Sequence, residues 1–149
     1  MTVSTNTSKL EIESFIEAPP NKCFTLVRDP RLPTATHTFV EGEFGLGQRV
    51  RFESKVFGMK QVLIVEVSEF EPDRLITDTM ISGAFREFRH IHEFTPKDGG
   101  TLMRDTLKWR SPFGILGTVA DLLFVRRRLR NIVERRNHML RQIACTGVS

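Results

Sequence analysis

The sequence predicts an α+β fold in which a curved antiparallel sheet of six to seven strands carries a long C-terminal helix over its concave face. Three observations predict it. Apolar and polar residues alternate through most of residues 37–109, with turn residues at short intervals. One amphipathic helical pattern follows between Leu122 and Ala144. The length of 149 residues matches one domain with a single core.

Composition narrows the class of protein further. Hydrophobic residues make up 40% and charged residues 27% of the chain, which are globular values and argue against a disordered or fibrous chain. Cys23 and Cys145 are the only cysteines and have no metal-ligand spacing, which excludes a disulfide scaffold and a zinc finger. No apolar run approaches the ~20 residues that cross a bilayer, and no signal segment is visible. We expect a cytoplasmic protein without a metal or another cofactor.

The individual elements follow from periodicity and from turn residues. We expect a flexible N-terminus over residues 1–8 and a single domain over 9–145. Its first strand, Lys9–Ala18, is ended by Pro19 and Pro20, and two short helices precede the sheet. The remaining predicted strands are His37–Glu41, Gln48–Val56, Met59–Phe70, Leu75–Ile81, Phe85–Thr95 and Thr101–Trp109.

Five short segments resemble a known superfamily. They are Phe-Gly-Met-Lys-Gln at 57–61, Glu-Pro-Asp-Arg-Leu at 71–75, Gly-Ala-Phe at 83–85, Phe-Arg-His-Ile-His-Glu-Phe at 88–94 and Gly-Gly-Thr-Leu-Met-Arg-Asp at 99–105. Over about residues 8–144 the chain resembles the SRPBCC, or START-like, superfamily, and most of all its bacterial ligand-binding branch grouped with polyketide cyclase/dehydrase-like proteins. The resemblance implies a helix-grip fold with a cavity for hydrophobic molecules beneath the last helix. Some branches are cyclases, dehydratases or hydrolases, but no catalytic motif unites them and none is carried over.

The hairpin around Lys97–Gly100 can be aligned from charge and apolarity, because residues opposite one another share a face. The best register places Glu93 opposite Arg104 and Glu87 opposite Arg110 on the outer face, at the cost of one like-charged pair, Arg89 with Lys108. The inner face then carries the pairs Phe94–Met103, His92–Asp105, His90–Leu107 and Phe88–Trp109. We expect these eight residues to line the ligand cavity together with Ile132 and Arg136 of the last helix.

The polar members of this set have two interpretations each. His92 and Asp105 form either a satisfied core pair or a proton-transfer pair, and the first is favoured because no nucleophile or oxyanion hole is visible. Arg136, near the centre of the apolar helix stripe, either binds an anionic ligand head or pairs internally with Asp105 or Asp78. The direction of Asp78 is left open. His90, His92 and Asp105 match zinc ligand chemistry, but their inferred pairing makes a metal the less favoured interpretation.

Three functions remain. The first is binding of a hydrophobic or amphipathic small molecule, such as a lipid, fatty acid, polyketide or aromatic compound. The second is a cyclase, dehydratase or hydrolase that uses His92 and Asp105. The third is a peripheral membrane or partner-binding module that uses residues 116–128, whose apolar side chains precede three arginines. Nucleic-acid binding is disfavoured because the arginines of the last helix scatter around its circumference. Whether the protein is a monomer or a homodimer is left open.

Overall fold

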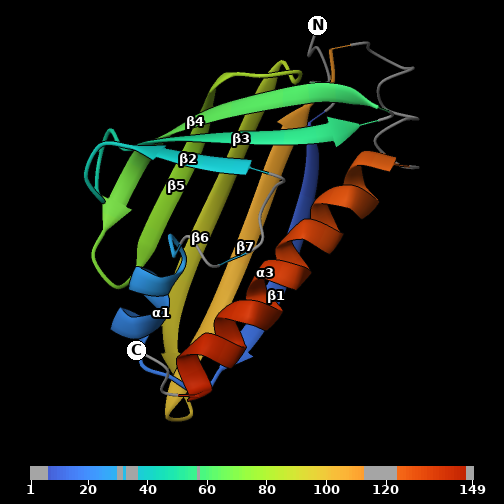
Figure 1. Cartoon of the computed structure of the whole chain (residues 1–149). Helices are drawn as coiled ribbons and strands as arrows, with labels where there is room; N and C mark the ends of the chain where they lie inside the picture. The colour runs from blue at the N-terminus through green and yellow to red at the C-terminus, as the bar shows by residue number, and fades with distance from the viewer. Residues whose placement is uncertain (1–6, 30–31, 33–36, 57, 113–123, 147–149) are drawn as a thin grey trace, which may run out of the picture.

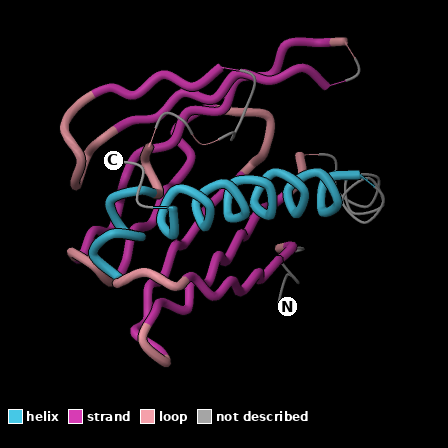
Figure 2. The backbone as a smooth tube through the Cα atoms, turned by 60° about the horizontal axis from the view of Figure 1, so that its bottom comes forward, coloured by secondary structure: helices cyan, strands magenta, loops and turns pink. Residues whose placement is uncertain are grey.

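A computed structural model describes residues 7–29, 32, 37–56, 58–112 and 124–146 of the protein. Within these residues seven strands form one antiparallel sheet in the order β1-β7-β6-β5-β4-β3-β2. The strands are β1 (Ser8–Ile16), β2 (His37–Glu41), β3 (Arg49–Val56), β4 (Met59–Glu71), β5 (Leu75–Ser82), β6 (Glu87–Lys97) and β7 (Gly100–Arg110). The sheet curls around the long helix α3 (Arg126–Thr146), and the short helix α1 (Pro20–Leu26) lies at one end of it (Figures 1 and 2). This is the predicted helix-grip arrangement.

The element boundaries agree with the periodicity to within a few residues. β1 begins at Ser8, inside the segment expected to be flexible, and ends at Ile16, before the two prolines that open α1. The predicted helix start at Leu122 lies outside the described residues, as do most of the segment expected to hold a second short helix and residues 116–123. No helix in the described part of the chain is long and apolar enough to cross a bilayer.

The curl of the sheet has a local cause in the pairing of β4 with β5. The pairing of β4 with β5 shifts twice: between Ile64 and Val65, where Ile81 of β5 has no partner in the register, and between Val67 and Glu69, where Ser68 of β4 has none. Such bulges bend a strand and increase its twist. At the second position the alternation of β4 breaks, because the polar Ser68 and Glu69 stand together between the inward Val67 and Phe70. The two bulges allow one sheet to surround α3 on several sides.

The β6–β7 hairpin has the register that charge and apolarity predicted. Glu87 pairs with Arg110, His92 with Asp105 and Lys97 with Gly100, which leaves Asp98 and Gly99 as the turn. Both turn residues have positive φ, 48° and 77°, as a two-residue hairpin turn of type I′ requires. The like-charged pair Arg89–Lys108 is present, and Arg89 donates to Glu69 of β4 at 2.6 Å, which compensates its charge.

The interior has three layers along the length of α3, two apolar and one polar. Next to α1 lies an apolar group that we call the α1 cluster: Ile16, Ala18, Cys23, Phe24, Val27, Leu32, Val67, Ile76, Phe94, Met103, Leu140 and Ala144. At the other end lies the Trp109 cluster: Leu10, Ile12, Val50, Val65, Phe88, Leu107, Trp109 and Val133. Between them lie polar residues from β1, β5, β6, β7, α3 and the segment after α1. This central set, the polar layer, consists of Ser14, Arg28, Asp78, His90, His92, Asp105, Arg136 and Asn137.

Candidate functional site

The polar layer is positioned by the alternation of the strands and by the period of the helix. Asp78 shares the inward face of β5 with Ile76, and Asp105 shares that of β7 with Met103 and Leu107, because residues two apart on a strand point the same way. Asp78 therefore points inward, which answers the question that its sequence left open. On α3, Arg136 and Asn137 lie one turn from the buried residues Val133 and Leu140.

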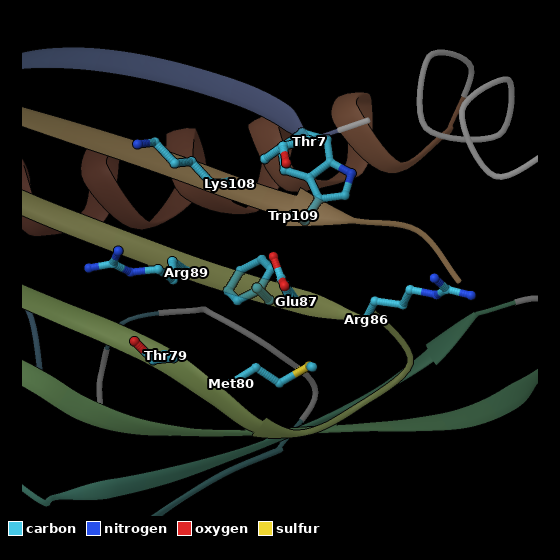
Figure 3. Close-up of a pocket in the computed structure, with 9 residues that line it drawn as sticks. Thr7, Thr79, Met80, Arg86, Glu87, Arg89, Lys108 and Trp109 are labelled. Atoms are coloured by element: carbon cyan, nitrogen blue, oxygen red, sulfur yellow. The ribbon is translucent and has the colours of Figure 1, made fainter. Parts of the chain in front are cut away.

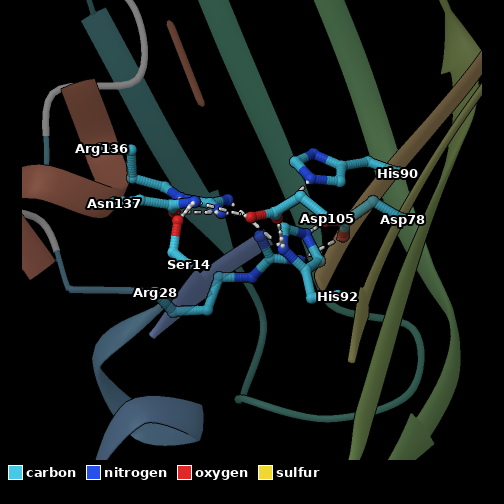
Figure 4. Close-up of polar contacts among 8 residues, drawn as sticks. All are labelled: Ser14, Arg28, Asp78, His90, His92, Asp105, Arg136 and Asn137. Atoms are coloured by element: carbon cyan, nitrogen blue, oxygen red, sulfur yellow. Dashed lines mark hydrogen bonds and ion pairs between the residues drawn. The ribbon is translucent and has the colours of Figure 1, made fainter. Parts of the chain in front are cut away.

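Asp105 is the centre of the layer and is fully buried (Figure 4). Its Oδ1 accepts hydrogen bonds from Nη2 of Arg136 at 2.6 Å and from Nε2 of His90 at 2.7 Å, and lies 3.1 Å from Nδ1 of His92. Its Oδ2 accepts from Nδ2 of Asn137 at 2.9 Å. Such a set of charged and neutral donors offsets the cost of burying a carboxylate. Arg136 thus pairs internally with Asp105, one of its two predicted roles.

The layer continues from His92 to the segment after α1. Nε2 of His92 lies 3.1 Å from Oδ2 of Asp78, and Oδ1 of Asp78 accepts from Nη2 of Arg28. His92 therefore stands between two carboxylates, with each ring nitrogen in contact with one of them. Two arginines and two aspartates balance in formal charge across the layer. The arrangement joins α1, the sheet and α3 through one hydrogen-bonded network.

The electrostatics follow from this pairing. Burial tends to raise the pKa of Asp105, but the Arg136 guanidinium and the histidine hydrogen bonds outweigh it and hold the pKa well below its usual range. Burial of Asp78 is likewise outweighed by His92 and Arg28, so its pKa is also lowered. For His90, burial lowers the pKa to about 3 despite the hydrogen bond to Asp105. At neutral pH the layer therefore holds two carboxylates and a neutral His90.

His90 lies at the margin of the layer. Its side chain is 13% exposed, whereas those of His92 and Asp105 are 1% and 0% exposed. The two imidazoles stack with ring centroids 3.8 Å apart. Because His90 pairs across the sheet with Leu107, a member of the Trp109 cluster, its ring lies on the side of the layer that borders that cluster. Asp105 also lies opposite a residue of that cluster, Ile12, but its side chain is fully buried, so His90 is the more accessible of the two.

A metal is poorly matched to this geometry. Ligand atoms of His90, His92 and Asp105 lie within 4.8 Å of one another, as a cation site would need. However, Arg136 already donates to the Asp105 oxygen that both histidines approach, and its Nη1 lies 3.3 Å from Nδ1 of His92. A cation at this point would meet a guanidinium at close range, which is electrostatically unfavourable.

The predicted apolar site residues are divided between the two clusters. Phe94 and Met103 pack in the α1 cluster, whereas Phe88, Leu107 and Trp109 pack in the Trp109 cluster, and Ile132 is half-buried on α3. A pocket of about 370 Å³ reaches the Trp109 cluster where β5 parts from β6, beyond the last pair Thr79–Arg89 (Figure 3). It is lined by Thr7, Thr79, Met80, Arg86, Glu87, Phe88, Arg89, Lys108 and Trp109.

Sequence reasoning missed three members of the layer. Asn137 forms hydrogen bonds with Asp105, Arg136 and Ser14. The helical period indicates its inward position, because Asn137 lies four residues after Val133 and three before Leu140. Ser14 had a weaker signal as the inward position between Ile12 and Ile16. Arg28 had none, because it follows α1 in a turn whose direction only the tertiary fold sets. Its Nε is buried and has no hydrogen-bond partner among the residues that the structure describes.

Comparison with solved structures places the fold among known ones. A protein from Thermus thermophilus superimposes with a TM-score of 0.80 at 22% identity, covering 95% of this chain and 100% of that chain. An aromatase/cyclase from Streptomyces gives a TM-score of 0.71 at 13% identity, covering 95% and 99%. A major latex-like protein from Panax ginseng gives 0.57 at 17% identity, covering 84% and 96%. At these identities the similarity concerns the fold alone.

Sequence comparison identifies the family. The comparison with curated proteins found no match. The family model described as polyketide cyclase / dehydrase and lipid transport matches residues 7–144, which include all seven strands, α1 and most of α3. This match covers nearly the whole chain and agrees with the helix-grip fold. The chain therefore belongs to the polyketide cyclase/dehydrase and lipid transport family.

Proposed function

We propose that the protein binds a hydrophobic or amphipathic small molecule between the sheet and the first half of α3, on the Trp109 side of the polar layer. Phe88, Leu107, Trp109 and Ile132 would contact its apolar part. His90 would contact its polar end, with Asp105 and Arg136 holding His90 in place. Membership of a family of cyclases, dehydrases and lipid-transport proteins supports this proposal.

One observation carries the proposal. Six apolar side chains that pack against the Trp109 cluster are only half-buried, although they lie on both sides of the space between the sheet and α3. On the side of the sheet these are Phe52, Leu63, Met80 and Phe85, and on the side of the helix Val125 and Leu129. Inward apolar groups that remain accessible are a usual feature of sites for apolar ligands. The pocket at the β5–β6 separation lies at this same end of the molecule, but Glu87, Arg89 and Lys108 of its lining belong to the outer face of the sheet, so it is not the proposed site.

The test is displacement of a neutral apolar dye, N-phenylnaphthylamine, together with native mass spectrometry of protein purified without organic extraction. The variant Leu129→Trp fills space beside the Trp109 cluster. We expect it to weaken dye binding at least tenfold, because the larger ring occupies the volume that the ligand needs. A co-purified apolar molecule should be visible in the wild-type protein and reduced in the variant.

The matched control is Leu46→Trp, which adds the same ring at a side chain that is 69% exposed. Circular dichroism and thermal unfolding establish that both variants fold. Equal dye binding by Leu129→Trp and Leu46→Trp would place the dye elsewhere and end the proposal. So would the absence of any bound molecule combined with no dye binding by the wild type.

An enzymatic role as a cyclase, dehydratase or hydrolase remains the alternative prediction, favoured by the contacts of His90 and His92 with Asp105. With His92 only 1% exposed and both its nitrogens engaged, a substrate would meet His90 first. A His92→Ala variant that binds as tightly as the wild type but loses turnover would support proton transfer through His92. Unchanged turnover would remove that role.

The peripheral-membrane or partner-binding alternative rests on residues 116–128, most of which lie outside the described part of the chain. Two of its arginines have contacts within the fold: Arg126 donates to the Lys9 carbonyl at 2.7 Å and Arg128 to the Lys55 carbonyl at 3.1 Å. Flotation with anionic vesicles at low salt is the test. The cytoplasmic location and the oligomeric state stay predictions.

A further inference from the structure

The polar layer determines which chemical group of a ligand it can receive. If the proposed function holds, the polar end of the ligand meets the layer from the Trp109 side. Two layer residues lie opposite Trp109-cluster residues, His90 opposite Leu107 and Asp105 opposite Ile12, and of these two His90 has the exposed side chain, at 13% against 0%. Asp105 and Arg136 are 0% and 5% exposed and lie behind it. The ligand therefore contacts a histidine, and not the buried arginine.

The contact with Asp105 fixes what His90 offers. Nε2 lies 2.7 Å from a carboxylate oxygen that is ionised, so this nitrogen carries the hydrogen and donates it. In a neutral imidazole the other nitrogen, Nδ1, is then an acceptor. Among the residues that the structure describes, Nδ1 of His90 has no hydrogen-bond partner, and Figure 4 shows the ring joined to the network through one nitrogen.

Within the described polar layer, the charge of each arginine is already paired with an aspartate. Arg136 donates through Nη2 to Asp105 at 2.6 Å and through Nε and Nη2 to Asn137 at 3.1 and 2.8 Å. Arg28 pairs with Asp78. Each arginine thus faces its own aspartate, and a third carboxylate would add an unpaired charge beside two existing ones in a region of low dielectric.

We propose that the site selects ligands whose polar end is an uncharged hydroxyl group, an alcohol or a phenol, which donates its hydrogen to Nδ1 of His90. The corresponding carboxylates are rejected because they have no hydrogen to donate and meet the charge of Asp105. Asp105 acts as a positioning residue that holds the acceptor tautomer of His90. The pKa of His90, lowered to about 3, agrees with a neutral ring at neutral pH.

The experiment compares three probes with one skeleton at neutral pH: naphthol, its methyl ether and naphthoate, substituted at the same ring position. Isothermal titration of the full chain should give a dissociation constant for naphthol roughly three- to tenfold lower than for the ether, the usual strength of one hydrogen bond. Naphthoate should bind more weakly than the ether. In His90→Phe, naphthol and ether should bind equally.

Two further variants keep the result interpretable. His138→Phe changes an exposed histidine of α3 and should keep the wild-type preference. His90→Gln offers a carbonyl acceptor and an amide donor, and should retain part of it if the variant folds by circular dichroism. Equal binding of naphthol and ether by the wild type, or tightest binding of naphthoate, overturns the hydroxyl assignment while leaving the proposed function intact. Failure of all three probes and of the apolar dye overturns both.

Discussion

Asp105 has the largest number of polar partners of any side chain in the described interior, and this makes it the residue on which the layer depends. Four side chains, those of His90, His92, Arg136 and Asn137, converge on its two oxygens. Burying such a charge costs free energy, so Asp105 stabilises the fold only through its pairing with Arg136 and its other hydrogen-bond donors. Removing one charge of the Asp105–Arg136 pair should therefore destabilise the protein more than removing both charges.

Replacing Asp105 by Asn keeps the shape but leaves Arg136 with no opposing charge in a site where it is 5% exposed. We expect Asp105→Asn to lower the free energy of unfolding by about 3–5 kcal/mol, the usual cost of breaking a buried ion pair. Urea unfolding measures it. Glu13→Gln, which removes the partner of Arg104 on the exposed face, is the control and should have a much smaller effect. Comparable losses would contradict the argument.

Removing the second charge should recover part of that loss. In the variant that combines Asp105→Asn with Arg136→Met, no unpaired guanidinium remains in the layer. We expect its unfolding free energy to exceed that of Asp105→Asn alone, with a coupling of roughly 0.5–3 kcal/mol in a double-mutant cycle. Strictly additive losses from the two substitutions would mean that Arg136 and Asp105 contribute independently.

At the scale of elements, the β6–β7 hairpin sets the register of the layer. Its inner face alternates in sequence, so a slip by one residue would expose Trp109 and bury Arg104 and Arg110. The two-residue turn at Asp98 and Gly99 fixes the pairing at the closed end. The strands could be predicted from alternation, and their register from charge, because both depend on neighbours across a single turn.

Alanine substitutions in the β6–β7 turn test how much backbone strain and steric contact each contribute to stability. Gly99 has φ of 77°, and a Cβ added there would meet nothing within 4 Å, so Gly99→Ala should cost about 1 kcal/mol through backbone strain alone. Gly100→Ala should cost more, because its Cβ would strike the Ile16 carbonyl and lie 2.8 Å from Cζ of Phe15. Thermal unfolding of both variants measures the difference. A Gly99→Ala protein less stable than Gly100→Ala would refute this order.

The bulges between β4 and β5 and the direction of Arg28 were not predictable in this way. A residue inserted into one strand shifts the alternation by one position, as at Ser68 and Glu69, but such a break does not distinguish a bulge from the end of a strand. The contact of Arg28 with Asp78 joins residues separated by 50 positions. Such a contact depends on how α1 packs on the sheet, which no local pattern encodes.

At the scale of the whole molecule, the layer links stability to pH. The pKa of His90 is lowered from 6.5 to about 3 on folding, so the unfolded chain binds one more proton between these values. Unfolding free energy should therefore fall as pH drops below about 6.5, by about 1.4 kcal/mol per pH unit from this group. The lowered pKa values of Asp78 and Asp105 act in the same direction, but only below about pH 4, where unfolded carboxyls take up protons.

The measurement is urea unfolding between about pH 6 and pH 4.5, a window in which His90 titrates in the unfolded chain and the aspartates do not. We expect the slope of unfolding free energy against pH to be clearly smaller in His90→Gln than in the wild type. His138→Gln, at an exposed position, is the matched control and should keep the wild-type slope. Identical slopes for all three proteins would show that His90 is not buried in neutral form.

The sequence by itself determined the order of the strands along the chain, the amphipathic face of α3, the register of the last hairpin and the inward direction of His90, His92 and Asp105. These depend on the period of a strand or helix and on charges a few residues apart. Tertiary structure decided that Asp78 points inward, that Arg136 is held by Asp105, and that Arg28, Ser14 and Asn137 complete the layer. Those contacts depend on the position of α1 and α3 over the curled sheet, and such distances are set by packing across the whole molecule.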